Sequence, residues 1–234
     1  MPVKLALPLI MAVTFLLANC GGGEAPPESA PEEEPTEMEE TPSEPESKED
    51  PAAMEETPPD AEPEAMPDAE PSRVRLETDK GALLLELYPD RAPETVANFL
   101  QYVDDGFYDG TIFHRVIPKF MIQGGGFDPE MQEKQARPPI QNESGAMANT
   151  KYTVAMARTP DPHSASAQFF INHQTNQFLD KENARDGWGY CVFGKVVEGT
   201  DVVESIAQVQ TGSKMGHQDV PLEPVVIKSA RRAS

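Results

Sequence analysis

Cysteine, tryptophan and basic residues are scarce in this sequence. Its 234 residues include two cysteines, Cys20 and Cys191, and one tryptophan, so a framework of several disulfides is excluded. Only 19 Lys and Arg stand against 40 Asp and Glu, which gives a formal net charge of −21 at pH 7. A chain this acidic is repelled by a phosphate backbone, which argues against nucleic acid as a partner.

The excess negative charge is concentrated in one segment. Residues 24–72 contain 19 of the acidic residues and 12 of the 24 prolines, but only one Lys and no aromatic residue. Such a segment cannot bury enough apolar surface to offset its ordering entropy, so we predict a disordered spacer. The pentapeptides MEETP and PDAEP each occur twice there without hydrophobic periodicity, which favours a spacer over a structural repeat. The alternative is an acidic tail that binds calcium or another cation.

Long hydrophobic runs are missing as well. The apolar run at residues 5–17, after Lys4, is too short for a membrane-spanning helix, which needs about 20 residues. A basic start, a short apolar core and a small-residue cleavage site describe an export signal. We therefore expect a signal peptide at 1–19, the spacer at 20–72 and a folded domain at 73–234.

The end of this signal, LANC at residues 17–20, resembles the lipobox of bacterial lipoproteins. The resemblance implies that Cys20 is acylated and becomes the new N-terminus, anchoring an exported protein on the periplasmic side of a bacterial membrane or at the cell surface. Gly21, where Asp is the alternative, favours the outer membrane in a cell with two membranes. Asn19 departs from the pattern, in which Gly, Ala or Ser is usual. The alternative is a soluble secreted protein with an incidental cysteine.

The first part of the folded domain reads as a hairpin followed by a helix. VRLET (74–78) alternates apolar and polar residues, and ALLLELY (82–88) returns after the turn DKG, which predicts two paired strands. Pro93 is suited to the first turn of a helix, and Gly106 marks its end. One buried face of this helix is predicted by the spacing of Val96, Phe99, Leu100 and Val103.

The remainder of the domain consists mainly of short strands. We predict them at 111–117, 120–124, 152–157, 167–172, 190–197 and 224–230. Asp201 is predicted to cap a second, short helix at 202–208. Many short strands, glycine-rich turns and only two helices favour a mainly β fold, a closed antiparallel barrel.

Motifs for covalent or metal chemistry are absent from the sequence. His114, His163, His173 and His217 lack the spacing of common zinc motifs, so no metal site is expected. No cofactor is expected either. There is no G-x-S-x-G elbow, and GGG at 124–126 lacks the Lys-Ser/Thr of a phosphate loop; close packing at a barrel corner explains it better. Cys191, in the strand-like run at 190–197, is interpreted as a small buried hydrophobic residue and not as a nucleophile.

Three longer motifs carry a specific resemblance. FHRVIPKFMIQGGGF (113–127), AMARTPDPHSASAQFFIN (155–172) and GWGYCVFGKVVEG (187–199) resemble the cyclophilins, the peptidyl-prolyl cis/trans isomerases, and above all their shorter bacterial members. The resemblance extends over essentially all of residues 73–234. It implies an eight-stranded antiparallel closed barrel with two helices, and an enzyme that needs no cofactor.

The resemblance also implies the roles of individual residues. Arg115 corresponds to the catalytic arginine, which donates a hydrogen bond to the prolyl nitrogen when the amide is twisted, and Gln123 to the residue that orients this arginine and the substrate. The apolar cup for the proline ring corresponds to Phe120, Met121, Phe170 and Leu179. Contacts to the flanking peptide correspond to Gln168 and the backbone of Ala157. Phe113 and Phe169 are expected to be ordinary core residues.

Three positions depart from the pattern of many eukaryotic members. Phe178 stands where they have Trp at the rim of the pocket, and Tyr190 stands where they have His. Arg158 replaces an Asn whose contact is mainly through its backbone. Bacterial members tolerate such changes, so isomerase activity is still expected, but the inhibitor cyclosporin should bind weakly because Phe lacks the indole donor.

The predicted function is therefore the isomerisation of X–Pro bonds in exported proteins by a lipid-anchored monomer. Its predicted partners are proline-containing polypeptides and, through the lipid, a membrane. The alternative is a binding module or chaperone that uses the same groove without turnover. In that case the apolar cup would matter more than Arg115.

Overall fold

The structure is a computed structural model that describes residues 72–233. The predicted signal peptide, the lipidation site Cys20 and the spacer up to residue 71 lie outside the described residues. Neither α-helix in the described part of the chain is long and apolar enough to cross a membrane.

The described residues form ten strands, two α-helices and one 3-10 helix. In chain order they are β1 (Ser72–Thr78), β2 (Ala82–Leu87), α1 (Pro93–Asp104), β3 (Ile112–Ile117), β4 (Met121–Gly124), β5 (Thr153–Met156), β6 (Phe169–Asn172), η1 (Gln177–Leu179), β7 (Val192–Glu198), α2 (Thr200–Ala207), β8 (Thr211–Lys214), β9 (His217–Pro221) and β10 (Val225–Ala233).

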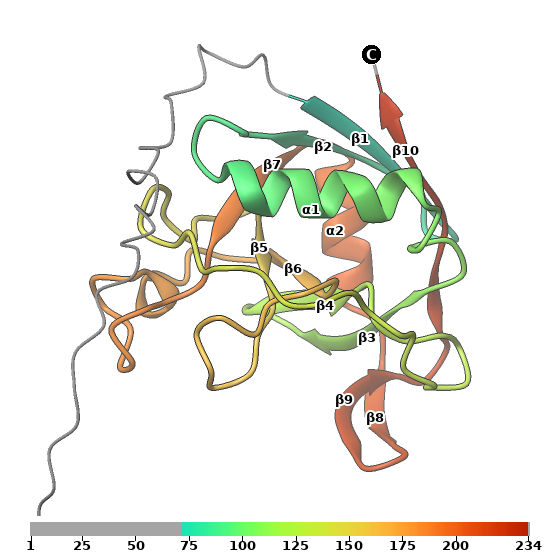
Figure 1. Ribbon diagram of the computed structural model, residues 1–234. Helices are drawn as coiled ribbons and strands as arrows, with labels where there is room; N and C mark the ends of the chain where they lie inside the picture. The colour runs from blue at the N-terminus through green and yellow to red at the C-terminus, as the bar shows by residue number, and fades with distance from the viewer. Residues whose placement is uncertain (1–71, 234) are drawn as a thin grey trace, which may run out of the picture. The chain divides into compact units, whose positions relative to one another are not determined.

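Eight of these strands close into an antiparallel barrel in the order β1-β10-β3-β4-β6-β5-β7-β2. This confirms the predicted eight-stranded barrel with two helices. The strands β8 and β9 were not predicted; they form a separate hairpin, which projects from the lower end of the barrel in Figure 1. Most of their residues are polar, and only two of the nine, Val220 and Pro221, are buried, so they lack the apolar alternation that identifies a barrel strand.

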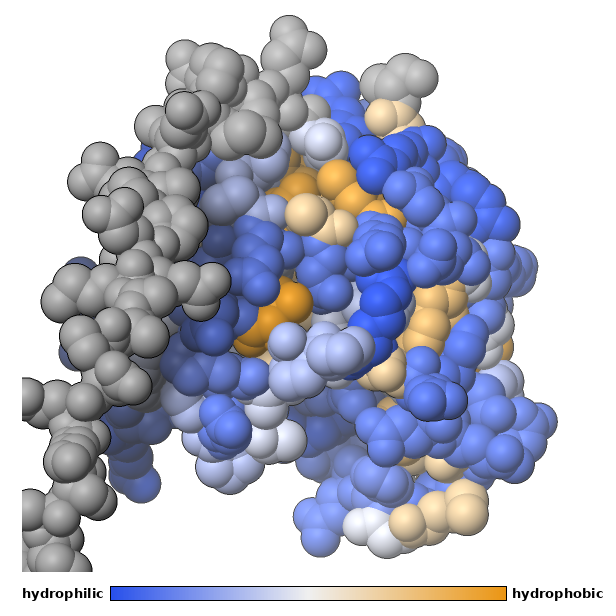
Figure 2. Space-filling view, viewed as in Figure 1, coloured by the Kyte–Doolittle hydropathy of each residue, from blue (hydrophilic) through white to orange (hydrophobic). Residues whose placement is uncertain are grey.

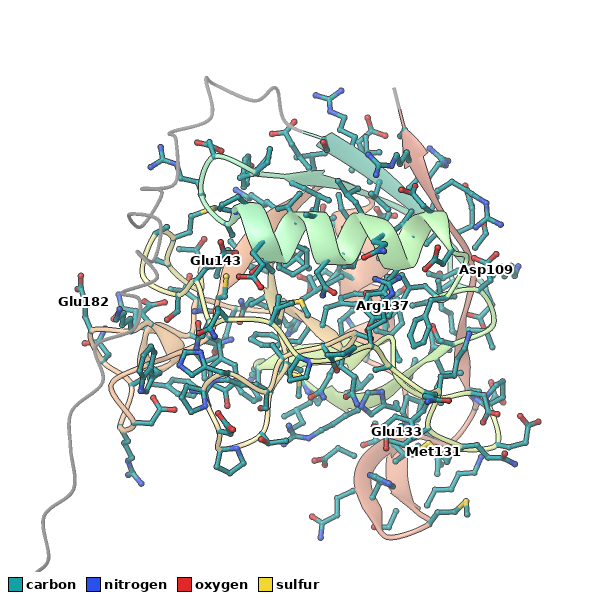
Figure 3. All side chains as sticks on the ribbon, viewed as in Figure 1. Asp109, Met131, Glu133, Arg137, Glu143 and Glu182 are labelled. Carbon is teal, nitrogen blue, oxygen red and sulfur yellow. The ribbon has the colours of Figure 1, made fainter. Side chains whose placement is uncertain are left out.

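The first helix, α1, has the predicted buried face, but its start is stabilised from a distance. Ala92 precedes it and offers no side-chain cap. Instead, the carboxylate of Glu143 accepts hydrogen bonds from the backbone N–H groups of Glu94 (3.1 Å) and Thr95 (2.7 Å) and from the Thr95 hydroxyl (2.7 Å). Figure 3 shows Glu143 beside this end of α1, where its negative charge also complements the helix dipole.

The predicted cap of the second helix was wrong. The N-cap of α2 is Gly199, with a φ of 81°, and Asp201 lies inside the first turn without capping it. The left-handed backbone that connects β7 to α2 requires a residue such as glycine. Asp201 still places a negative charge near the positive end of the helix dipole.

Side chains alternate between the inside and the outside of the barrel. Ile122 on β4 faces the main core, together with the predicted core residues Phe113 and Phe169, which are fully buried. Met121, next to Ile122, belongs to a second apolar cluster that also contains Phe170. The face of the molecule in Figure 2 is otherwise largely hydrophilic, with small hydrophobic patches.

Cys191 is a free, buried cysteine, as predicted. Burial raises the pKa of its thiol to about 11, so it is protonated at neutral pH. A thiol in this state is a poor nucleophile.

Candidate active site

One row of neighbouring residues crosses five barrel strands on the outer face. Arg115 on β3 is paired with Gln123 on β4, which in turn is paired with Phe170 on β6. The row continues through Ala155 on β5 to Val192 on β7. Since paired residues of adjacent strands point to the same face, a guanidinium, an amide and an aromatic ring are placed in sequence along the outside of the barrel.

A β-bulge brings Arg115 to this outer face. The pairing of β3 with β4 slips by one residue between Phe113 and Arg115. The extra residue reverses the alternation, so that Phe113 and Val116 both join the main core while Arg115, between them, faces outwards. The spacing of two core residues three positions apart in FHRV is the sequence signal of this bulge.

His114 is the extra residue of the bulge and lies beneath Arg115. It is only 4% exposed, its ring packs on Phe127 with 4.6 Å between ring centroids, and its Nδ1 has no hydrogen-bond partner among the described residues. Burial, followed by the nearby His217 and Arg115, lowers the pKa of His114 to about 4. It is therefore neutral at pH 7 and adds no second charge below the guanidinium.

A pocket opens beside the guanidinium. Its lining comprises Arg115, Phe120, Met121, Gln123, Ala157, Arg158, Phe170, Leu179 and Tyr190. The structure thus brings together eight of the ten residues predicted to bind substrate or act on it. The other two, Gln168 and Phe178, lie at its edges, and Arg158 is an addition.

The floor of the pocket is apolar and well packed. Met121, Phe170 and Leu179 are 2%, 3% and 8% exposed, and the half-buried Phe120 and Tyr190 form walls against them. Tyr190 meets Phe170 edge to face, with ring centroids 5.7 Å apart. Such a floor excludes water from whatever apolar group occupies it.

The wall at Phe120 is held by hydrogen bonds from the segment that follows β6. The carbonyl of Phe120 accepts bonds from the N–H of His173 (2.9 Å) and from Nδ2 of Asn176 (3.0 Å). The preceding residue, Lys119, has a φ of 60° and donates its N–H to Nδ1 of His173 at 2.8 Å. Nε2 of His173 therefore carries the ring proton and lies 2.8 Å from Glu204 on α2.

A buried hydrogen-bond network that was not predicted connects Asn176 to the turn at Leu179. Asn172 donates to the side-chain oxygens of Asn149 (3.2 Å) and Thr153 (3.0 Å), and accepts a bond from Asn176 (2.7 Å). Asn149 donates its backbone and side-chain N–H groups to Asp180 at 2.6 and 3.0 Å. Asp180 follows η1, so this network fixes the turn that carries Leu179.

Gln123 and Gln168 are coupled directly. Nε2 of Gln123 donates a 3.0 Å hydrogen bond to Oε1 of Gln168. No side-chain hydrogen bond joins Gln123 to Arg115 among the described residues, although the two are paired across the strands. Gly126, at the end of the GGG turn, makes room for Gln168, because a Cβ there would lie 2.5 Å from Cγ of Gln168. The predicted close backbone packing at this corner is confirmed at Gly124, where a Cβ would lie 3.0 Å from the carbonyl oxygen of Ile112.

Arg115 itself is half exposed. Its side chain is 43% accessible, and its Nε lies 3.9 Å from Oδ2 of Asp219, on β9, which is 42% accessible. It is therefore not part of a buried ion pair, and the guanidinium is free to meet a ligand in the pocket.

Arg158 has a larger role than its predicted backbone contact. Its side chain is 4% exposed and forms an ion pair with Asp186, and its Nε and Nη2 donate to the carbonyl of Gly189 at 3.1 and 3.0 Å. Its guanidinium lies 4.6 Å from the centre of the Tyr190 ring. The Arg158 hydrogen bond, assisted by the N–H groups of Trp188 and Gly189, lowers the pKa of Asp186 to about 2. Arg158 thus ties the loop before β7 to the pocket wall.

Phe178 lies on the rim and not in the pocket. Its side chain is 58% exposed and stacks on Phe120, with ring centroids 5.6 Å apart and an interplanar angle of 27°. It lines a separate hollow on the far side of Tyr190. This position agrees with the predicted alignment of Phe178 to the rim.

Known proteins are similar to this chain in sequence and in fold. The family model for the cyclophilin type peptidyl-prolyl cis-trans isomerases matches residues 73–232. The chain belongs to the cyclophilin family. This cyclophilin is 60% identical to the peptidyl-prolyl cis-trans isomerase cyp18 of Streptomyces antibioticus over 162 residues, which cover 68% of this chain and 98% of the relative. It is 54% identical to peptidyl-prolyl cis-trans isomerase B of Escherichia coli K12 over 158 residues, covering 67% and 96%.

Solved structures agree with the barrel. The crystal structure of a Cryptosporidium parvum cyclophilin in the presence of the dipeptide Ala-Pro matches with a TM-score of 0.59 and 27% identity, covering 69% of this chain and 99% of that one. Because the similarity to the bacterial isomerases extends over nearly their whole length, this cyclophilin is a peptidyl-prolyl cis-trans isomerase.

Proposed function

We propose that this cyclophilin holds the proline of a polypeptide in the apolar cup and accelerates rotation about the preceding amide bond with Arg115. The observation that carries the proposal is the placement of the Arg115 guanidinium beside the floor formed by Met121, Phe170 and Leu179. A proline ring seated there brings its amide next to the guanidinium.

The chemistry requires no covalent step. Resonance gives the amide a rotation barrier of about 18–20 kcal/mol, and a catalyst has only to bind the twisted amide better than the planar one. In the twisted state the prolyl nitrogen gains a lone pair, which can accept a hydrogen bond from Arg115. Arginine suits this role because it remains charged and its donors lie in a rigid plane.

The cup contributes through its apolar character. The planar amide is more polar than the twisted one, so removal of water destabilises the planar state more. Lowering a relaxation time of about 100 s to about 1 ms takes roughly 7 kcal/mol. One charge-assisted hydrogen bond supplies about 1.5–3 kcal/mol, and positioning and desolvation supply the remainder.

The flanking peptide is held by polar groups at the other edge of the cup. Ala157 donates its N–H to the carbonyl of Gln168 at 2.9 Å, which fixes its backbone beside the cup. The Ala157 carbonyl would accept a hydrogen bond from the bound peptide. The Gln168 side chain lies next to it and is kept in place by Gln123. Phe178 and Tyr190 supply apolar contact at the rim.

The test is isomerisation of an X–Pro peptide by Arg115→Ala. We expect kcat to fall about 10- to 100-fold with KM nearly unchanged, because the lost hydrogen bond exists only in the twisted state. Arg115→Lys should restore part of the rate. The matched control is Arg91→Ala, which removes another exposed arginine with a carboxylate neighbour, Asp90; it should leave kcat unchanged.

The fold should survive this substitution, since Arg115 is half exposed and its only ion pair in the described residues is long. Circular dichroism and melting of each variant establish this. A folded Arg115→Ala protein with near-normal kcat would remove Arg115 from the mechanism. It would favour instead a module that binds proline-containing chains through the cup.

We also propose that the enzyme acts outside the cytoplasm on exported proteins, anchored through lipid on Cys20. The support is the LANC motif after a short apolar run, followed by the acidic, proline-rich segment up to residue 72. A segment of that composition would act as an extended tether and allow the catalytic domain to reach polypeptides away from the membrane surface.

A further inference from the structure

The hairpin of β8 and β9 lies outside the barrel, but it is firmly attached to it. Val220, only 3% exposed, joins a small apolar cluster with Ile112, Phe127 and Met131. The ring of His217 meets Phe127 edge to face at 5.2 Å between centroids. Figure 3 shows Met131 next to this hairpin. The neighbours of Asp219 on β9 are therefore held against the strand that carries the catalytic arginine.

Asp219 is the residue that this hairpin presents to Arg115. The Oδ2 atom lies 3.9 Å from Nε, so the carboxylate approaches the inner side of the guanidinium and leaves the two terminal amino groups for substrate. The backbone of Asp219 has a φ of 59°. Side-chain-bearing residues adopt this conformation at some cost in free energy, and such residues gather at functional sites.

Among residues 72–233, Arg115 has one partner of opposite charge. Within the part of the chain that the structure describes, Asp219 is the one carboxylate that forms an ion pair with Arg115. Gln123, the residue expected to orient the arginine, donates from its Nε2 to Gln168, and no side-chain hydrogen bond joins it to Arg115 among the described residues. Beneath, His114 is neutral at pH 7 and offers no charge.

We propose that Asp219 is a positioning residue for catalysis, which restrains the Arg115 guanidinium so that its terminal N–H groups point at the prolyl nitrogen. The proposal rests on the proposed role of Arg115. Both side chains are partly exposed, so the coupling has the modest size of a surface ion pair. The expected effect of removing the carboxylate is a loss of about two- to fivefold in kcat.

The experiment compares Asp219→Asn with the unaltered full-length protein at low ionic strength. Asparagine is chosen because it tolerates positive φ and has nearly the same shape. We expect kcat to fall about two- to fivefold with KM unchanged, and the deficit to shrink in 1 M salt, where the Debye length is about 3 Å. Asp219→Glu should restore part of kcat. Asp90→Asn, which disrupts a surface pair with Arg91, is the matched control and should have no effect.

A spectroscopic measurement separates positioning from a structural role. The Nε–H resonance of Arg115 in a proton–nitrogen NMR spectrum, identified by its loss in Arg115→Lys, should shift and broaden in Asp219→Asn. If Asp219→Asn melts early, Asp219→Gly provides the same test, since glycine adopts the positive φ freely.

Two results would overturn the proposal. One is an unchanged kcat together with an unchanged Arg115 resonance. The other is a higher kcat, which would mean that the carboxylate hinders the hydrogen bond from Arg115 to the prolyl nitrogen. Either result, combined with a large loss in Arg115→Ala, leaves the proposed function intact, whereas a normal kcat in Arg115→Ala removes both.

Discussion

Gln123 donates a 3.0 Å hydrogen bond to Gln168 across the edge of the pocket. Gln123 lies on β4, and Gln168 immediately precedes β6, its neighbour in the barrel. The bond therefore links the row that contains Arg115 to the backbone at Ala157, whose N–H binds the carbonyl of Gln168. The two amides form one unit that connects β4, the neighbour of the strand that carries Arg115, to the groups proposed to hold the flanking peptide.

If the two glutamines act as a unit, their effects should not add. We expect Gln123→Ala and Gln168→Ala each to lower kcat/KM about two- to tenfold, the range for loss of one hydrogen bond. The double variant should have a kcat/KM close to that of the less active single variant, because the second substitution removes the partner of a hydrogen bond that is already lost. Steady-state kinetics on one X–Pro peptide complete this double-mutant cycle. Multiplication of the two losses would show that the residues act independently.

Gly126→Ala offers a test that leaves both glutamines in place. The added methyl group would lie 2.5 Å from Cγ of Gln168, so that side chain has to move and its bond to Gln123 is disturbed. We expect kcat/KM to fall by an amount similar to that for Gln168→Ala, measured in the same assay. A Gly126→Ala protein with normal kinetics would contradict the idea that this glycine is required by Gln168.

The resemblance of three motifs to the cyclophilins predicted most of the residues that line the pocket. Arg115, Phe120, Met121 and Gln123 come from one hairpin, and its alternation and glycines are visible in the sequence. Side-chain contacts over long separations were not predictable in this way. Asp219 reaches Arg115 from a polar hairpin, and no pattern within the hairpin itself indicates that contact.

Long separation in sequence also explains why the capping of α1 was not predicted. Glu143 caps α1 from 48 residues away, and the cap expected locally at Asp201 was wrong because a glycine in a left-handed conformation begins α2. A residue that differs from the family pattern can also have a role that the pattern does not indicate. Arg158 was expected to contribute its backbone, but its buried side chain binds Asp186 and the Gly189 carbonyl.

His114 should make the protein less stable in mild acid. Its pKa falls from 6.5 to about 4 on folding, so between these values the unfolded chain binds a proton that the folded chain does not. Stability from this residue is fully present above pH 6.5 and is lost as the pH falls towards 4. The loss between pH 7 and pH 5 should be about 2 kcal/mol.

Urea denaturation at pH 7 and pH 5 measures this effect. In His114→Gln, which cannot titrate, the change in the free energy of unfolding between the two pH values should be smaller by that amount. Asp186 and Glu204 have pKa values lowered to about 2, so they lose stabilisation only at lower pH and do not interfere. An identical pH dependence in the variant would show that His114 titrates normally in the folded protein.

His173 should control the Phe120 wall of the cup. Its ring Nδ1 accepts a hydrogen bond from the backbone N–H of Lys119, and its backbone N–H donates to the Phe120 carbonyl. In His173→Ala the side-chain bond is lost and Lys119 retains its positive φ without support, so the wall should loosen. We expect KM for an X–Pro peptide to rise about two- to tenfold, with a smaller change in kcat.

His163→Ala is the matched control for this prediction. His163 also accepts a backbone hydrogen bond, from Asn142 at 3.2 Å, but it does not contact Phe120. Its KM should therefore stay near that of the unaltered protein. Equal effects of the two substitutions would mean that KM reports general destabilisation and not the Phe120 wall.

The two cysteines provide a direct test of lipid anchoring. Cys20 lies outside the described residues and ends the LANC motif, whereas Cys191 is buried and its thiol has a pKa raised to about 11. Cys20→Ser should therefore remove acylation and shift the protein from the membrane fraction to a soluble or unprocessed form, while Cys191→Ser should not. Each buried CH₂ of an acyl chain adds about 0.8 kcal/mol of membrane affinity, so the shift should be large.

Mass spectrometry of the N-terminal peptide and membrane fractionation measure the acylation and the shift. The kcat/KM of Cys20→Ser should remain unchanged, because Cys20 is far in sequence from the motifs that contain the pocket residues. A Cys20→Ser protein that is matured normally and still pellets with the membrane would rule out the lipid anchor and favour a secreted isomerase.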